Sequence, residues 1–230
     1  LQDTVDEHRR HKDVYEHTLT VLQQAMDLET GPDGDVPGPD LRLRLAALMH
    51  DIGKPATRRF MPDGTVTFHA HDYVGARMTA KRMRALHFDK QTIKDVSRLV
   101  ELHLRFHGYA DSPWSDSAVR RYVTDAGPLL ARLGCLTRAD VTTGNRRKAA
   151  MLSHAYDDLE RRIEALREQE ELASIRPELD GQEIMAELGI KPGPEVGKAY
   201  KFLLDLRMER GPIGKELARE ALHSWWATQQ

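Results

Sequence analysis

The sequence lacks the features that mark secreted and membrane-bound proteins. Its single cysteine, Cys135, excludes an intramolecular disulfide, and the small apolar surroundings of this residue predict a buried thiol in a reducing compartment. No apolar run approaches the roughly 20 residues that a membrane-crossing helix needs. The charged amino terminus is unlike a signal peptide. We therefore expect a cytoplasmic protein with no membrane partner.

An excess of charge of one sign is also absent. The chain has 34 basic and 36 acidic side chains, so the field of the whole chain gives no indication of nucleic-acid binding. Any contact with RNA must come from local patches. Internal repeats and low-complexity tracts are absent as well. With 230 residues the chain can bury a sizeable core, and we expect two compact helical units.

Apolar residues recur at helical spacing along most of the chain. In the stretch 8–29, His17 lies three residues after Val14 and four before Val21, so it is predicted to face inward with them. Segments 30–40 and 108–116 are expected to be loops. Further helices are predicted at 41–51, 72–86, 90–105, 115–124, 127–141 and 146–173, with shorter helical runs at 180–189, 194–210 and 213–230.

The predicted helix 41–51 ends in a histidine and an aspartate. Its apolar positions, Leu48 among them, are predicted to face inward, and Gly53 ends it because glycine tolerates a left-handed cap. His50 and Asp51 therefore occupy its last turn. Beyond it, Pro62-Asp63-Gly64 separates two short strand-like runs, which predicts a hairpin within 57–68 that could act as a flap.

Inward-facing histidines and aspartates indicate a metal centre. A hydrolytic metal site needs neutral imidazoles and ionised carboxylates around a cation, with a position left for water. A buried carboxylate without a partner would cost on the order of several kcal/mol, and a cation is the simplest partner. Imidazole and carboxylate suit divalent Mn, Fe, Co, Ni or Zn, and suit Mg less well. The predicted ligands are His17, His50, Asp51 and Asp140.

Four further residues are candidates for the chemistry, together with Asp51. A bound divalent ion lowers the pKa of its water to about 7, which yields a nucleophile for phosphorus. His71 and His103 could hold a second ion or contact the phosphate. Lys54 and Arg138 each lie within three residues of a proposed ligand and could neutralise charge on phosphoryl oxygens.

Each histidine also has a simpler interpretation. The chain has 11 histidines, and a lone one is more often a hydrogen-bonded core residue than a ligand. His69 and His107 are weaker candidates, because His69 alternates with His71 in extended chain and His107 begins a loop. The remaining histidines are interpreted as surface or structural: His8, His11, His87, His154 and His223.

These residues carry a family resemblance. His17, the adjacent His50-Asp51 pair and Asp140, in that order, resemble the HD superfamily of metal-dependent phosphohydrolases. Longer motifs resemble the carboxy-terminal part of bacterial, and by their wording actinobacterial, tRNA nucleotidyltransferases, the CCA-adding and poly(A) polymerase family. The resemblance covers nearly the whole chain. The motifs are Tyr15–Leu19, Ala47–Thr57, Phe68–Gly75, Arg138–Asn145 and Leu188–Gly197.

The resemblance implies an all-α protein: an HD-domain helical bundle with a short β-hairpin insertion over residues 1–172, then a small helical domain over residues 173–230. It implies phosphatase or 2′,3′-cyclic phosphodiesterase chemistry and tRNA as a partner. The nucleotidyltransferase head of the family, with its glycine-serine motif and paired aspartates, has no counterpart in this sequence. We therefore expect no nucleotide addition by this chain alone.

Two local patches are candidates for RNA contact. Gly193 begins a helix whose free amides could bind a backbone phosphate, with Lys198 and Lys201 one turn further on. The second patch is Arg146, Arg147 and Lys148. An ordinary helix start and a solvated charged face explain the same residues. A free-standing HD phosphohydrolase acting on small nucleotides and a catalytically silent RNA-binding scaffold remain the competing hypotheses.

Overall fold

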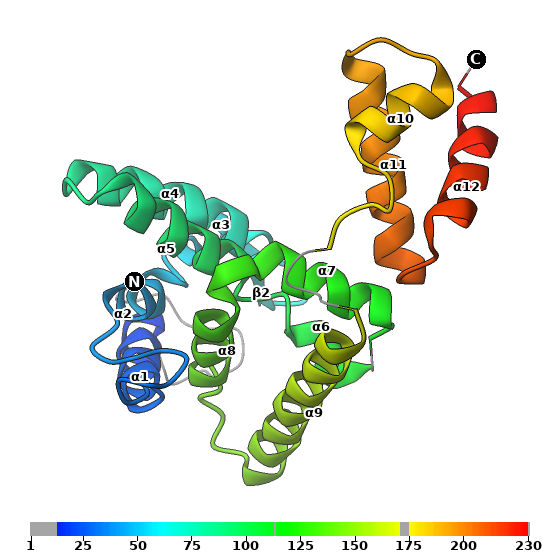
Figure 1. Cartoon of the computed structure of the whole chain (residues 1–230). Coiled ribbons are helices and arrows are strands. Elements are labelled where there is room, and N and C mark those ends of the chain that lie inside the picture. The colour runs from blue at the N-terminus through cyan, green and yellow to red at the C-terminus, as the bar shows by residue number, and fades with distance from the viewer. Residues whose placement is uncertain (1–12, 113, 171–174, 230) are drawn as a thin grey trace. The chain divides into compact units, whose positions relative to one another are not determined.

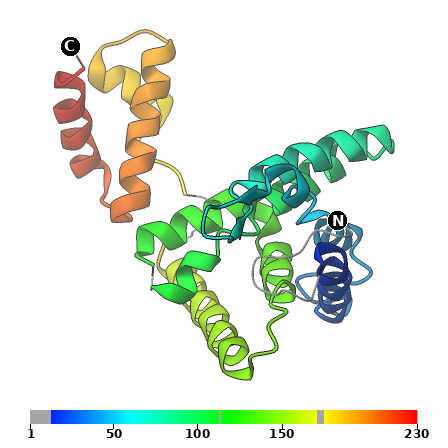
Figure 2. The same cartoon turned by 180° about the vertical axis from the view of Figure 1, so that it is seen from behind.

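The computed structural model describes residues 13–112, 114–170 and 175–229. Apart from one two-stranded sheet, the regular elements of these residues are helical, which confirms the predicted all-α class (Figure 1, and Figure 2 from behind). By contacts the chain forms two compact units, residues 1–112 with 126–158 and residues 113–125 with 159–230. This division by contacts does not follow the expected boundary between residues 172 and 173. The assignment of an HD domain and a separate tail domain at that boundary stays a prediction.

The first unit is a bundle built around α2. This helix packs against α1, α5 and α8, while α4 packs against α5. Figure 1 shows α1, α2 and α8 next to one another. The elements are α1 (Val14–Asp27), α2 (Leu41–Met49), α3 (Lys54–Thr57), β1 (Arg59–Phe60), β2 (Val66–Thr67), α4 (His71–Ala85), α5 (Lys90–Leu102), α6 (His107–Asp111), the 3-10 turn η1 (Gly127–Leu129), α8 (Leu130–Ala139) and the first part of α9 (Arg146–Glu170).

Aspartates start three of the helices that carry the candidate site. Asp13, Asp40 and Asp89 are the N-caps of α1, α2 and α5, and each side chain accepts a hydrogen bond from the backbone N–H three residues on. Asp40 also accepts hydrogen bonds from the guanidinium of Arg132 in α8, at 2.7 and 3.0 Å. The start of α2 is therefore held against α8.

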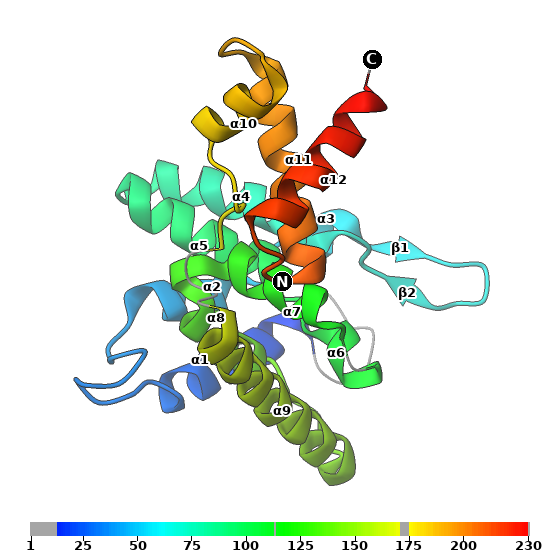
Figure 3. The same ribbon diagram turned by 45° about the vertical axis from the view of Figure 1, so that its right-hand side comes forward.

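The predicted hairpin is present. β1 and β2 are antiparallel, with Arg59 opposite Thr67 and Phe60 opposite Val66. At the turn, the Asp63 carboxylate accepts hydrogen bonds from the backbone N–H and the hydroxyl of Thr65. Figure 3 shows the hairpin projecting beyond the helices of the first unit.

The second unit contains α7 (Asp116–Ala126), the end of α9, α10 (Gly181–Leu188), α11 (Pro194–Arg210) and α12 (Lys215–Ala227). The Arg120 side chain donates to the carbonyl of Met208 at 3.1 Å, which ties α7 to α11. Phe202 stacks on Trp225 with 5.0 Å between ring centroids. The three carboxy-terminal helices enclose their own apolar core, formed by Leu179, Ile184, Ala199, Leu203, Ala218 and Leu222.

Three local predictions were wrong. Segment 108–116 is not all loop, because His107–Asp111 forms the short helix α6. Leu48 is 42% exposed, since α2 turns Leu43 and two alanines into the core instead. Cys135 is half-buried rather than buried. Residues 8–12 of the first expected helix lie outside the described residues. In the part of the chain that the structure describes, no helix is both long and apolar enough for a bilayer.

Candidate metal centre

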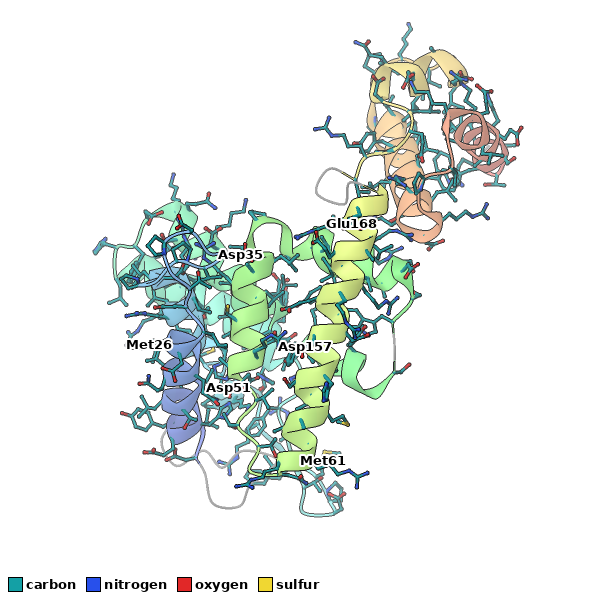
Figure 4. All side chains as sticks on the ribbon, turned by 60° about the horizontal axis from the view of Figure 1, so that its bottom comes forward. Met26, Asp35, Asp51, Met61, Asp157 and Glu168 are labelled. Carbon is teal, nitrogen blue, oxygen red and sulfur yellow. The ribbon has the colours of Figure 1, made fainter. Side chains whose placement is uncertain are left out.

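Six of the predicted residues meet in the first unit. We call them the HD cluster: His17, His50, Asp51, His71, His103 and Asp140. His50, His103 and Asp140 are the C-cap residues of α2, α5 and α8. The partial negative charge of these three helix ends favours a cation at the cluster. Figure 4 labels Asp51 within this bundle.

Four ligand atoms converge at one side of Asp51. The Nε2 atoms of His17 and His50 are 3.2 Å apart. His17 Nε2 lies 3.0 Å from Asp140 Oδ1 and 3.4 Å from Asp51 Oδ2. His50 Nε2 lies 3.2 Å from Asp51 Oδ2. Ligands about 2.1 Å from one metal ion lie roughly 3.0 to 3.4 Å apart, so His17, His50 and Asp51 fit a divalent ion, while Asp140 Oδ1 lies 3.6 Å from His50 Nε2.

A second group of ligand atoms uses the other carboxylate oxygen. Asp51 Oδ1 lies 3.3 Å from His71 Nε2, and the rings of His71 and His103 are 5.3 Å apart. Asp51, His71 and His103 together offer ligand atoms close enough to hold an ion. His103 Nε2 is buried and has no hydrogen-bond partner among the described residues. Such a buried nitrogen calls for a partner, and a cation would supply one.

Backbone carbonyls orient three of the histidines. A carbonyl only accepts hydrogen bonds, so Nδ1 carries the proton and the Nε2 lone pair is turned to the cluster. The fourth histidine of the HD cluster, His17, has a side-chain partner instead: Thr142 Oγ1 lies 3.1 Å from its Nδ1. Sequence reasoning missed these supports, although the carbonyl always lies three residues before the histidine. The pairs are His50 with Ala47 (2.8 Å), His71 with Phe68 (2.8 Å) and His103 with Val100 (2.6 Å).

Burial and neighbouring charges shift the pKa values of His50 and His103 in opposite directions. Burial alone would lower the pKa of His50, but the carboxylates of Asp51 and Asp140 raise it to about 9. Burial, with the neighbouring charge of His50, lowers the pKa of His103 to about 4. Burial opposes ionisation of Asp51, yet His50, His71 and Lys54 hold its pKa well below the usual value. A metal ion would therefore compete with a proton on His50 and meet a neutral His103.

The two predicted cations lie in different surroundings. Lys54 is buried, and its Nζ lies 2.9 Å from Asp51 Oδ2. Arg138 pairs with Asp157 at 2.9 Å and lies over the ring of Tyr156, with its guanidinium carbon 5.0 Å from the ring centroid. It lines a cavity of about 370 Å³ together with Gln24, Asp27, Leu28, Val141, Ala149, Ser153 and Tyr156. A phosphate contact by Arg138 stays a prediction.

Comparison with known proteins agrees with this geometry. The HD domain family matches residues 14–145, a span that contains the whole HD cluster. The chain belongs to the HD domain family. It is 35% identical over 222 residues to the A-adding tRNA nucleotidyltransferase of Deinococcus radiodurans, covering 95% of this chain and 48% of that protein. It is 37% identical over 219 residues to the CC-adding tRNA nucleotidyltransferase of Thermus thermophilus, covering 94% and 45%.

These two matches confirm the predicted resemblance of the chain, its HD domain included, to tRNA nucleotidyltransferases. The chain spans about half the length of these curated relatives. Neither relative tests the actinobacterial wording, which stays a prediction.

The candidate RNA patches lie on the surface. Arg146, Arg147 and Lys148 are exposed at the start of α9. Lys198 pairs with Glu195 at 3.0 Å, and Lys201 is exposed. Gly193, the N-cap of α11, lies in an open pocket of about 640 Å³ lined by Asp180, Gly181, Gln182, Met185, Pro192, Gly193, Val196 and Gly197. RNA binding at either patch stays a prediction.

Proposed function

We propose that this chain is the HD phosphohydrolase and tRNA-binding part of a tRNA nucleotidyltransferase. Its HD domain hydrolyses phosphomonoesters or 2′,3′-cyclic phosphodiesters with a divalent metal ion. The observation that carries the hydrolytic part is the buried Asp51. Its Oδ2 lies close to His50 and Lys54, and its Oδ1 lies close to His71. The names of the two relatives support the tRNA part. Nucleotide addition would need protein beyond these 230 residues.

Asp51 Oδ2 and the three ligand atoms around it would hold the ion, which is Mn, Ni, Co, Fe, Zn or Mg. When bound, such an ion supplies Lewis acidity and lowers the pKa of water at the site. Lys54 contributes a buried positive charge close to Asp51 that would stabilise the charge on phosphoryl oxygens. The ligands are His17, His50, Asp51 and Asp140.

The second group of ligand atoms, from Asp51, His71 and His103, is better suited to holding a second ion than to contacting the phosphate. His103 donates its Nδ1 proton to Val100, and its lowered pKa leaves Nε2 without a proton. A phosphate oxygen needs a donor, whereas a metal ion needs the lone pair that Nε2 offers. We therefore infer that His71 and His103, with Asp51 Oδ1, hold a second ion.

The test measures metal content and turnover together. Wild-type protein is loaded with Mg, Mn, Co or Ni, and hydrolysis of 2′,3′-cyclic AMP, 2′-AMP and p-nitrophenyl phosphate is followed. Asp51→Ala should lose both metal and turnover, and His103→Ala should lose one equivalent of metal. His154→Ala, which removes an exposed histidine of α9, is the matched control.

The outcomes separate the hypotheses. Metal content unchanged in Asp51→Ala would overturn the proposed site. If His103→Ala keeps all its metal and loses turnover, the second group contacts the phosphate instead. Turnover of mononucleotides without any affinity for tRNA would favour a free-standing nucleotide phosphohydrolase.

The tRNA part has its own test. Binding of tRNA elbow and acceptor fragments is measured at low salt, where phosphate contacts are strongest. Lys148→Ala and Lys198→Ala should each reduce the salt slope by about one phosphate contact. Lys94→Ala, an exposed lysine of α5, is the control. Absence of binding by the wild type at low salt would contradict a tRNA-binding role.

A further inference from the structure

Cationic and aromatic side chains alternate outward from Asp51 into the hairpin. The Lys54 ammonium, next to Asp51, lies 5.6 Å from the ring centroid of Phe68. Farther out, the Arg58 guanidinium lies 4.7 Å from the ring centroid of Phe60. Phe68 is 2% exposed, whereas Phe60 is 71% exposed. We call Lys54, Phe68, Arg58 and Phe60 the hairpin track.

The strand register places Phe60 and Val66 on one face of the hairpin, and Phe68 directly follows the end of β2. Phe60 is directly opposite Val66, and Phe68 follows Val66 by two residues, the period of a strand. Two extended residues span about 7 Å, so the exposed ring lies a short distance from the buried one. The base of the hairpin is fastened to the HD cluster, because the carbonyl of Phe68 accepts the Nδ1 proton of His71. Figure 4 labels Met61 in the hairpin and Asp51 in the bundle.

The track has unused binding capacity. Arg58 Nε is buried and has no hydrogen-bond partner in the described part of the chain. Phe60 exposes most of its ring, so packing within the first unit does not explain this aromatic residue. The carboxylate in the hairpin turn, Asp63, accepts hydrogen bonds from Thr65. A base could stack on the exposed ring while a guanidinium binds a backbone phosphate, as single-stranded nucleic acids require.

We propose that the hairpin track docks a single-stranded RNA end whose terminal phosphate lies at the HD cluster. A base stacks on Phe60, and Arg58 binds a backbone phosphate one step from the end. This inference rests on the proposed phosphohydrolase function and assigns its substrate class. A mononucleotide would place its phosphate at the cluster and leave Arg58 without an anion. A duplex would keep its bases stacked away from the ring.

The test uses a fluorescent hexaribonucleotide that ends in a 2′,3′-cyclic phosphate. Its affinity is measured by anisotropy, and its hydrolysis gives KM and kcat separately. Loss of one base-stacking contact should weaken binding of the hexanucleotide about tenfold in Phe60→Ala and raise its KM by a similar factor. The value of kcat should change little, because Phe60 belongs to neither ligand group of the HD cluster. Arg58→Gln should weaken binding and flatten its salt dependence.

Conservative variants distinguish stacking from apolar contact. Phe60→Trp should restore binding because it keeps an aromatic face, whereas Phe60→Leu should not. Leu86→Ala, which removes a side chain that is 55% exposed at the end of α4, is the control. Turnover of p-nitrophenyl phosphate should be the same in all of these variants.

Two results would overturn the inference. Wild-type affinity of Phe60→Ala and Phe60→Leu for the hexanucleotide would exclude stacking on this ring. An equal loss of affinity for 2′-AMP and for the hexanucleotide in Arg58→Gln would assign the track to mononucleotides. Neither result involves p-nitrophenyl phosphate. Failure of the proposed phosphohydrolase function is therefore seen separately, because turnover of p-nitrophenyl phosphate would then not depend on Asp51.

Discussion

Gly53 allows the turn after the His50-Asp51 pair to lie directly on the start of α4. A Cβ at this position would lie 2.2 Å from the carbonyl oxygen of His71 and 2.8 Å from the amide nitrogen of Gly75. Both are backbone atoms, so they cannot rotate away. The φ of Gly53 is −78°, which alanine adopts freely, so the steric conflict is the whole effect. Regaining normal contact requires a shift of roughly 1 Å between the two segments.

The magnitude of Gly53→Ala follows from this shift. Overpacking costs about 1 to 3 kcal/mol, while the reduced freedom of the unfolded chain returns about 0.4 to 1 kcal/mol. We expect the free energy of unfolding to fall by about 1 to 2 kcal/mol. The effect on activity should be larger, because a misplacement of about 1 Å at a reacting site costs roughly 10²-fold in rate. His71 would move relative to Asp51.

The assay compares Gly53→Ala with a matched substitution. Alanine at Gly31, in the loop before α2, meets no atom within 4 Å and should change neither quantity. Urea unfolding gives stability, and metal content and p-nitrophenyl phosphate turnover give the state of the site. If Gly53→Ala is as stable and as active as Gly31→Ala, the contact between the turn and α4 has no role in placing His71.

Three further predictions concern charge and metal. Burial opposes ionisation of Asp40, but Arg132 and the Leu43 amide hold its pKa below 3.8. Because the pKa is lower in the folded state, the stability that the Asp40 carboxylate contributes is present above pH 3.8 and lost as pH falls through the folded pKa. Asp40→Asn should therefore be less stable at pH 7 by about 1 to 2 kcal/mol and approach the wild type in acid; an unchanged gap in urea titrations would contradict this. Lys54→Met should lower kcat about 10²-fold and keep its metal, unlike the control Lys94→Met, and equal kcat in both would refute the assignment. A chelator should lower the melting temperature of wild type but not of Asp51→Ala, as scanning fluorimetry would show.

Local sequence signals determined the elements and the order of the ligands. The Pro62-Asp63-Gly64 turn specifies the hairpin because its residues suit tight turns. Helical spacing placed His17 beside Val14 and Val21, and all three are buried. The adjacent His50-Asp51 pair, predicted for the last turn of the helix, comes directly after Met49, the last helical residue of α2. Such features depend on residues close in the chain, so spacing alone reveals them.

Only the tertiary structure decided which of these residues meet. His17 and Thr142 are 125 residues apart, and no spacing predicts their contact. Leu48 was expected in the core and is exposed, because the face that α2 buries depends on its partners α1, α5 and α8 rather than on its own periodicity. The pairing of Arg138 with Asp157 likewise depends on how α8 and α9 pack. The sequence supplies the ligands, and long-range packing brings them within a few ångströms of Asp51.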